Sequence, residues 1–212
     1  MSIFEVRDDL YKVCLVGDGG VGKTAIVERF LGRGFASTYN LTIGTNICTH
    51  TVDVDGTRVK FQIWDLAGQK RFEFVRATFY RGSHAIVMVF DVTNPNSLAN
   101  LHEWKNEILQ NLGKSHHDIP IVLLGNKSDL QQKLLIDQDG ISKFKDELKM
   151  EFHADSTAFM YTSALSGMNI EESFEALGLL LLKKRKPQIY IDKTPNNFQH
   201  LSNLPSSRPS KA

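Results

Sequence analysis

The stretch VCLVGDGGVGKTAIVERFL, at residues 13–31, places a cluster of glycines between a continuous apolar run and a segment with helical periodicity. An apolar run of this kind is typical of a strand covered on both faces of a sheet. Residues 17–24 match the pattern G-x-x-x-x-G-K-[ST], in which backbone N–H groups surround phosphate oxygens at a helix N-terminus. The stretch therefore predicts an α/β fold with a phosphate site after its first strand.

Strand-like and helical segments alternate along most of the chain. Strands are predicted at 11–17, 45–54, 58–65, 85–91, 120–126 and 158–163, and helices at about 22–32, 70–80, 96–112, 138–151 and 169–186. The alternation favours parallel strands between two layers of helices, and the continuous apolar runs at 13–16, 86–90 and 121–124 predict central strands. Asp55-Gly56 predicts a two-residue hairpin and hence one antiparallel edge strand. The sequence NPNS, at 94–97, is typical of a helix start.

Composition and charge exclude several classes of function. The 25 Lys and Arg residues nearly balance the 24 Asp and Glu residues, so no overall charge attracts nucleic acid or an anionic membrane. We interpret Cys14 and Cys48 as small buried residues rather than disulfide or metal ligands. No apolar run reaches the length of a membrane span, and the N-terminus is charged. We expect a protein of the reducing cytoplasm.

The chain is predicted to contain one globular domain. Residues 1–9 form a short N-terminal extension, and residues 10–186 form the domain. Residues 187–212 hold four of the six prolines among Asn, Ser and Gln, which predicts a mostly disordered tail.

Polar side chains within and after the glycine-rich loop suit a phosphate site. Lys23 can neutralise outer phosphates, and the Thr24 hydroxyl can ligate magnesium. A glycine-rich turn without a ligand would explain neither residue. Asp65, at the end of the third strand, could act in the outer shell of the magnesium, and Gly68 could offer an N–H to a terminal phosphate. Turns of the type Asp-x-x-Gly are common, so only the position after a strand gives this pair weight.

Three further motifs extend the pattern: WDLAGQ (64–69), GNKSDL (125–130) and TSALSG (162–167). In their order and spacing with the glycine-rich loop, residues 10–186 resemble the Ras-superfamily small GTPases, and FYRGS (79–83) is most similar to the Rab-like branch. The resemblance implies the P-loop NTPase (small GTPase) fold, with a six-stranded, mostly parallel sheet, one antiparallel edge strand and five flanking helices. It also implies that the protein binds GTP and GDP with Mg²⁺.

The guanine site follows from the same resemblance, which assigns it to Asn126, Lys127 and Asp129. The Asp129 carboxylate can accept hydrogen bonds from the ring N–H and the exocyclic amine of guanine together, a donor pair that adenine lacks. Without the glycine-rich loop, an ordinary polar loop would be an equally good interpretation. The resemblance implies the following nucleotide contacts: Gly19, Gly20, Val21, Gly22, Lys23, Thr24, Ala25, Phe35, Thr42, Gly68, Asn126, Lys127, Asp129, Ser163, Ala164 and Leu165.

Several of these positions admit a second interpretation. Phe35 corresponds to the aromatic residue that flanks the base, or it anchors a loop to the core. Thr42 corresponds to the threonine that closes on magnesium, so that Thr24, Thr42 and Asp65 form the metal set, or it simply begins a strand. Ser163 and Ala164 correspond to residues that present backbone N–H groups to guanine.

Three positions depart from the family pattern. Leu41 replaces a frequent proline, and Leu165 replaces the usual lysine and keeps packing on the base without a polar contact. Lys70 replaces the usual glutamate. This reversal of charge alters hydrolysis or partner choice, or else Lys70 is an ordinary solvated surface charge.

The implied reaction is attack of water on the γ-phosphorus of GTP, which releases GDP and phosphate. Gln69 would orient the water, Lys23 would stabilise charge on the phosphoryl oxygens, and Thr42 would contribute by closing on the magnesium. No arginine of the chain is evident near the site, so hydrolysis is expected to be slow without an activating protein. The alternatives are a GTP-binding interaction module with little hydrolysis, and a P-loop ATPase or small-molecule kinase.

The implied biology is that of a switch in vesicle trafficking or signalling. Segments 35–46 and 66–82 would change with the nucleotide and contact exchange factors, activating proteins and effectors. We expect a monomer that does not bind nucleic acid. Ser2 and the lack of a cysteine after Cys48 predict no lipid anchor, so contact with membranes would be peripheral and through partners. KKRK (183–186) is better explained as helix-end charge than as a lipid patch, and His116-His117 as a surface loop than as a metal site.

Overall fold

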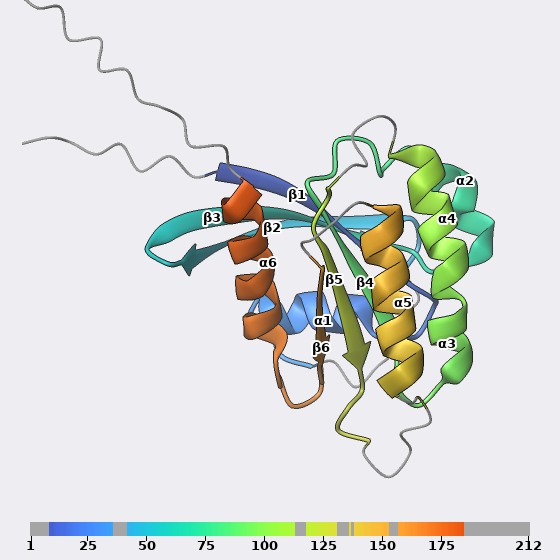
Figure 1. Ribbon diagram of the computed structural model, residues 1–212. Coiled ribbons are helices and arrows are strands. Elements are labelled where there is room, and N and C mark those ends of the chain that lie inside the picture. Colours follow the sequence, from blue (N-terminus) through green and yellow to red (C-terminus); the bar gives the residue numbers. More distant parts are fainter. Residues whose placement is uncertain are drawn as a thin grey trace, which may run out of the picture.

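The computed structural model (Figure 1) describes residues 9–35, 42–112, 118–130, 136, 138–152 and 157–184. Its elements are β1 (Asp9–Val16), α1 (Lys23–Phe30), β2 (Thr45–Val54), β3 (Thr57–Leu66), the 3₁₀ helix η1 (Lys70–Phe72), α2 (Glu73–Arg76), β4 (Ala85–Asp91), α3 (Pro95–Ala99), α4 (Leu101–Asn111), β5 (Ile121–Asn126), α5 (Gln138–Glu151), β6 (Thr157–Tyr161) and α6 (Ile170–Lys184). The predictions for Ser2, Leu41, His116-His117 and the tail at 187–212 concern positions outside the described residues.

The six strands form one sheet in the order β2-β3-β1-β4-β5-β6. Strands β1, β4 and β5, predicted as central from their apolar runs, lie in the interior of the sheet, and every residue of β4 and β5 is buried. All neighbouring strands pair in parallel except β2 and β3. Asp55 and Gly56 form the predicted hairpin, where Gly56 N donates a hydrogen bond to Asp53 Oδ1 (2.8 Å). The sequence-based prediction of a mostly parallel sheet with one antiparallel edge strand is confirmed.

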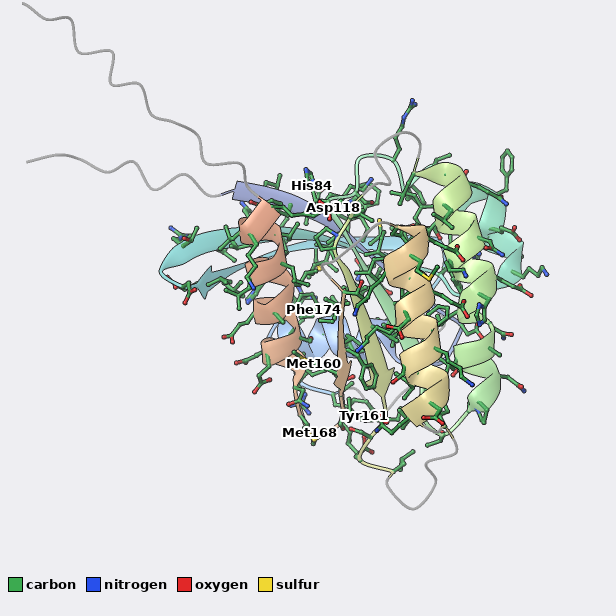
Figure 2. The ribbon with its side chains drawn as sticks, in the orientation of Figure 1. His84, Asp118, Met160, Tyr161, Met168 and Phe174 are labelled. Atoms are coloured by element: carbon green, nitrogen blue, oxygen red, sulfur yellow. The ribbon has the colours of Figure 1, made fainter. Side chains whose placement is uncertain are left out.

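Helices cover both faces of this sheet (Figure 1). On one face, buried residues of α1 and α6 pack against the sheet, and the Phe30 and Phe174 rings stack with centroids 3.7 Å apart. Phe174 is labelled in Figure 2. On the other face, α4 and α5 contribute Trp104 and Phe144 to a second cluster. Because apolar side chains alternate between the two faces of each strand, the molecule has three layers with two cores.

Two of the five predicted helical segments differ from their expected extent. Residues 70–80 are helical only at 70–76, as η1 followed by α2. Residues 96–112 are divided into α3 and α4 at Asn100, whose carbonyl accepts a hydrogen bond from Glu103 N at 3.0 Å and from Trp104 N only at 3.4 Å. The tighter turn interrupts the regular helix. The predicted start of α3 is confirmed, because Asn94 Oδ1 caps the helix by accepting from Asn96 N (3.2 Å) and Pro95 occupies its first position.

Neither cysteine forms a disulfide. Cys14 is fully buried, whereas Cys48 is only half-buried, and burial raises the pKa of both thiols. Along the described part of the chain, no helix combines the length and the apolar character needed to cross a bilayer.

Candidate functional site

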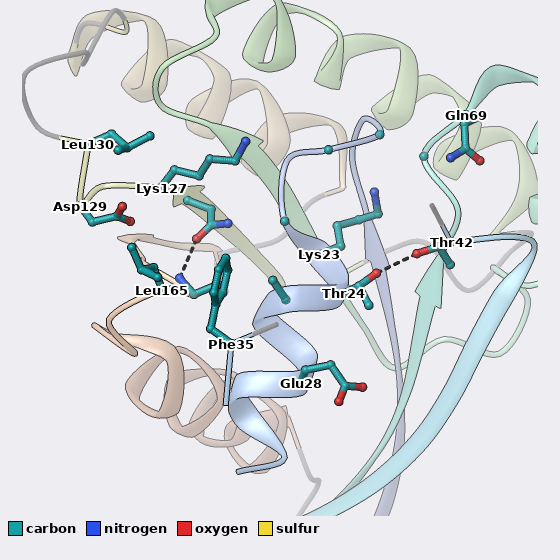
Figure 3. Close-up of a pocket in the computed structure, with 17 residues that line it drawn as sticks. Lys23, Thr24, Glu28, Phe35, Thr42, Gln69, Lys127, Asp129, Leu130 and Leu165 are labelled. Carbon is teal, nitrogen blue, oxygen red and sulfur yellow. Dashed lines mark hydrogen bonds between the residues drawn. The ribbon is translucent and has the colours of Figure 1, made fainter. Parts of the chain in front are cut away.

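A cavity of about 620 Å³ lies beyond the ends of strands β1, β3, β5 and β6. Its lining residues come from α1, the end of β5 and loops that are far apart in sequence (Figure 3): Gly19, Gly20, Gly22, Lys23, Thr24, Ala25, Glu28, Phe35, Thr42, Gly68, Gln69, Asn126, Lys127, Asp129, Leu130, Ala164 and Leu165. The predicted contacts therefore lie around one cavity, except that Val21, Ser163 and Asp65 do not line it. Glu28 and Leu130 line it without having been predicted.

One end of the cavity is built by the N-terminus of α1. The first N–H groups of a helix have no partner within the helix and attract negative charge. Gly22 precedes α1 with a φ of 101°, and a Cβ placed there would lie 2.2 Å from Asn126 Nδ2. Only glycine allows this approach. Lys23 is buried, and its Nζ donates to the carbonyls of Gly17 (2.7 Å) and Asp18 (2.8 Å).

The charge of Lys23 is sensitive to this environment. Burial lowers the pKa of Lys23 to about 8, while the nearby Asp65 and Asp18 carboxylates act in the opposite direction. An anion beside the ammonium group would favour its charged form. The site is thus suited to a phosphate next to Lys23.

Three side-chain oxygens converge beside Lys23. Thr24 Oγ1 donates to Asp65 Oδ2 (2.5 Å) and lies 2.8 Å from Thr42 Oγ1. Asp65 is almost fully buried, and its Oδ1 accepts no hydrogen bond from any described residue. Burial raises the pKa of Asp65, and Thr24 and Lys23 oppose that effect. A buried carboxylate oxygen without a partner, next to two hydroxyls, matches the oxygen ligands of Mg²⁺. These residues fit the predicted metal set.

Gln69 lies at the same end of the cavity, and Gly68 fixes its backbone close to the glycine-rich loop. A Cβ on Gly68 would lie 2.4 Å from Asp18 C and Gly19 N. Gln69 Oε1 is buried and accepts no hydrogen bond within the described residues. The side chain can therefore accept a hydrogen bond from a group that enters the cavity.

The opposite end of the cavity is organised by Asn126, which is almost fully buried. Asn126 Nδ2 donates to the Val21 carbonyl (2.8 Å), and its Oδ1 accepts from Ala164 N (3.2 Å). Asn126 thus ties the glycine-rich loop to the loop after β6. Val21 contributes to this tie through its carbonyl, which explains why it belongs to the site without lining the cavity.

Asp129 and Lys127 are each held by a second polar group. Ser163 Oγ donates to Asp129 Oδ1 (2.6 Å), so Ser163 orients a lining carboxylate rather than facing the cavity itself. Lys127 Nζ lies 2.6 Å from Asp91 Oδ2. Burial alone would raise the pKa of Asp91, but hydrogen bonds from Lys127 and Thr93 hold it below its ordinary value.

Apolar side chains surround Asp129 at this end (Figure 3). Phe35, Leu130 and Leu165 are 44%, 39% and 51% exposed, although each lines the cavity. The Arg29 guanidinium donates to the Ala164 carbonyl (3.0 Å) and to the Leu165 carbonyl, which anchors their loop to α1. Apolar side chains around one carboxylate suit an aromatic ligand with adjacent donors.

The family model described as "Ras family" matches residues 12–183. The chain belongs to the Ras family. It is 37% identical over 177 residues to Ras-related protein Rab-13 from Bos taurus, an alignment that covers 84% of this chain and 82% of that protein. The chain is therefore a Rab-like small GTPase that binds GTP and GDP with Mg²⁺, hydrolyses GTP to GDP and phosphate, and acts as a molecular switch. The alternative of an interaction module with little hydrolysis is not favoured.

No motif in the sequence identified Arg76, which lies next to the site of this small GTPase. Arg76, at the end of α2, is 3% exposed, and its Nη1 donates to the carbonyls of Ala67 (3.1 Å) and Gln69 (2.7 Å). Arg76 does not line the cavity. Its partner Glu107 was also missed, because the two residues are 31 positions apart and neither belongs to a motif.

Proposed function

We propose that the cavity binds GTP with the guanine beside Asp129 and the triphosphate beside Lys23. The observation that carries this proposal is that a single cavity is lined at one end by the helix N-terminus with Lys23 and at the other by a carboxylate among apolar side chains. The amide N–H groups at the start of α1 would bind phosphate oxygens, and Lys23 would neutralise the outer phosphates. Asp129 would accept both donors of the guanine edge.

The remaining residues at the base end have supporting roles in this proposal. Phe35 and Leu165 would pack on the purine, with Leu165 supplying packing where a lysine would add a polar contact. Ser163 would hold Asp129 in its accepting orientation, and the Asp91 carboxylate would hold Lys127. Adenine lacks this donor pair, so the Asp129 carboxylate would lose both hydrogen bonds when an adenine nucleotide occupied the cavity.

Hydrolysis is proposed to depend on Gln69. Its Oε1, which has no hydrogen-bond partner among the described residues, would accept a hydrogen bond from the attacking water and so orient it toward the γ-phosphorus. Lys23 and backbone N–H groups would stabilise charge on the phosphoryl oxygens. Thr24, Thr42 and Asp65 would hold Mg²⁺, which would supply further positive charge next to the phosphates. The guanidinium of Arg76 is engaged by Glu107 and by backbone carbonyls. We therefore propose that a partner supplies the arginine that accelerates hydrolysis, by about 10³–10⁵, as arginine fingers do in GTPases in general, Ras included.

The partners are proposed to bind segments 35–46 and 66–82, because their described residues Thr42, Gly68 and Gln69 line the proposed phosphate end of the cavity. Ile43 and Phe74 are 78% and 89% exposed in the described parts of these segments. Exposed apolar side chains of this size are typical of binding surfaces. We propose that exchange factors, activating proteins and effectors read the bound nucleotide there, and that the monomer serves vesicle trafficking or signalling in the cytoplasm, reaching membranes through these partners.

Two measurements test the proposal. In competition binding, GTP should displace a labelled guanine nucleotide far better than ATP does, and Asp129→Asn should reduce that preference because an amide cannot accept both donors. In single-turnover hydrolysis, Gln69→Leu should slow phosphate release from preloaded protein. An unchanged purine preference in Asp129→Asn would refute the placement of the base. An unchanged rate in Gln69→Leu would refute the role of the glutamine.

A further inference from the structure

Arg76 makes an unusual set of contacts for a residue at the end of a short helix. It donates four hydrogen bonds: Nη1 to the carbonyls of Ala67 and Gln69, and Nε and Nη2 to the two carboxylate oxygens of Glu107 at 3.0 and 2.7 Å. A planar guanidinium that is paired through two parallel hydrogen bonds has a fixed direction. The group therefore holds the Gln69 carbonyl in a defined place.

Glu107 is itself held from a second direction. Tyr80 Oη donates to Glu107 Oε1 (2.8 Å), and the Trp104 ring lies 4.2 Å from the Arg76 guanidinium. The side chains of Arg76 and Glu107 are 4% and 10% exposed in this ion pair. Because the pair is mostly buried, solvent screens the attraction between the two charges only weakly. Removing one partner is therefore costly.

The same face of α4 also holds the glycine-rich loop. Asn100 Nδ2 and Trp104 Nε1 donate to the Asp18 carboxylate at 2.7 and 2.9 Å. Asn100, Trp104 and Glu107 are spaced four and three residues apart, which places them on one side of a helix. Gly68 is pressed against the backbone at Asp18 on the other side. The backbone of residues 67–69 thus lies between the glycine-rich loop and Arg76, and α4 braces both.

We propose that Arg76, fixed by Glu107, is a positioning residue for hydrolysis that sets the backbone from which Gln69 reaches the attacking water. Arg76 acts through the Gln69 carbonyl and does not itself line the cavity. The inference rests on the proposed role of Gln69. It assigns to α4 a function in the rate of hydrolysis in addition to packing.

The test is single-turnover hydrolysis of GTP in preloaded protein. Displacing a catalytic group by about 1 Å can cost about 100-fold in rate. We therefore expect Arg76→Met to slow phosphate release by about 10- to 100-fold and Glu107→Gln to slow it less, while the affinity for GTP stays within about threefold. In a Gln69→Leu background neither substitution should slow release further, because the residue that they position is absent.

Glu151→Gln, in α5, provides a matched control because it perturbs a different buried ion pair of α4. Lys105 is a buried cation of α4 that is bound by Glu151 (2.7 Å) and Glu147 (3.1 Å), and it touches no residue of the cavity. Glu151→Gln replaces one of these carboxylates with an amide of the same shape. It should lower thermal stability without changing the hydrolysis rate. If Arg76→Met does not fold, the hydrolysis rate of Glu107→Gln tests the inference instead.

Two results would overturn the inference. One is an unchanged rate in Glu107→Gln. The other is an equal slowing of Arg76→Met with and without Gln69. If Gln69→Leu alone leaves the rate unchanged, the proposed role of Gln69 is wrong. This outcome is distinct from one in which Gln69 matters but Arg76 does not position it.

Discussion

At the scale of single residues, the approach of Gly22 to Asn126 makes a sharp prediction. A Cβ at residue 22 would lie 2.2 Å from Asn126 Nδ2, and the φ of 101° disfavours any side chain. We expect Gly22→Ala to lower the free energy of unfolding by at least about 1–3 kcal/mol and to weaken GTP binding strongly, since Asn126 ties both loops of the cavity. Urea unfolding and nucleotide titration would measure the two effects.

Gly19→Ala is the comparison for stability. A Cβ at residue 19 would meet no atom within 4 Å. Its free energy of unfolding should therefore stay close to that of the parent. A Gly22→Ala variant as stable as Gly19→Ala would contradict the close packing seen in the structure.

A second prediction concerns Ser163, which does not line the cavity. Its hydroxyl donates to Asp129 Oδ1 at 2.6 Å. Hydrogen bonds to charged groups contribute about 1.5–3 kcal/mol, so Ser163→Ala should weaken GTP binding by about 10-fold or more and reduce the preference for GTP over ATP. Ser128→Ala is a suitable control, because Ser128 is buried and donates to the Thr162 carbonyl (2.9 Å) without contacting Asp129. Equal affinities of the two variants would contradict the proposed role of Ser163.

At the scale of secondary-structure elements, β1 and the start of β4 share a titratable contact. Lys12 N, in β1, donates to His84 Nδ1 (2.9 Å), next to the first residue of β4 (Figure 2). Partial burial lowers the pKa of His84, and the charge of Lys12 lowers it further. The unfolded chain therefore binds a proton more readily than the folded one, so stability should fall as the pH drops through the ordinary histidine range of about 6.5.

His84→Asn isolates this contribution, since the asparagine Oδ1 can accept the same hydrogen bond at any pH. Urea midpoints at about pH 7.5 and 5.5 should differ less in His84→Asn than in the parent. An identical difference in both proteins would show that His84 does not contribute.

Most elements could be predicted from the sequence because their patterns are local. Continuous apolar runs specified β1, β4 and β5, and Asp55-Gly56 specified the hairpin. The division at Asn100 could not be predicted, because its side chain bonds to Asp18, 82 residues away. The short extent of α2 also accompanies long-range contacts. Its last residue, Arg76, binds Glu107 and the carbonyls near the site.

The candidate site divides in the same way. Motifs identified the residues that line the cavity, such as Lys23, Gln69 and Asp129. They could not identify residues that contact the lining residues without lining the cavity themselves, because those contacts join elements that are distant in sequence. Arg76 and Glu107 belong to this group. The Ser163 hydroxyl also belongs to it, because it binds Asp129, whereas the resemblance implied a contact only through the Ser163 backbone N–H.

At the scale of the whole molecule, the parallel sheet brings these residues together. The carboxyl ends of β1, β3 and β5 lie at one edge, so loops that follow them in sequence become neighbours in space. The two helical layers bury the sheet and add their own contacts, with α1 supplying the phosphate end and α4 bracing the loops. The fold therefore determines both the distance between the two ends of the cavity and the rigidity of its walls.

A crystal structure of the protein with a non-hydrolysable GTP analogue and Mg²⁺ tests the central claim most directly. The account predicts the guanine edge within hydrogen-bonding distance of the Asp129 carboxylate, the terminal phosphate beside Lys23, and the metal in contact with Thr24 and near Asp65. A nucleotide bound in the reverse direction, or bound outside this cavity, would contradict it.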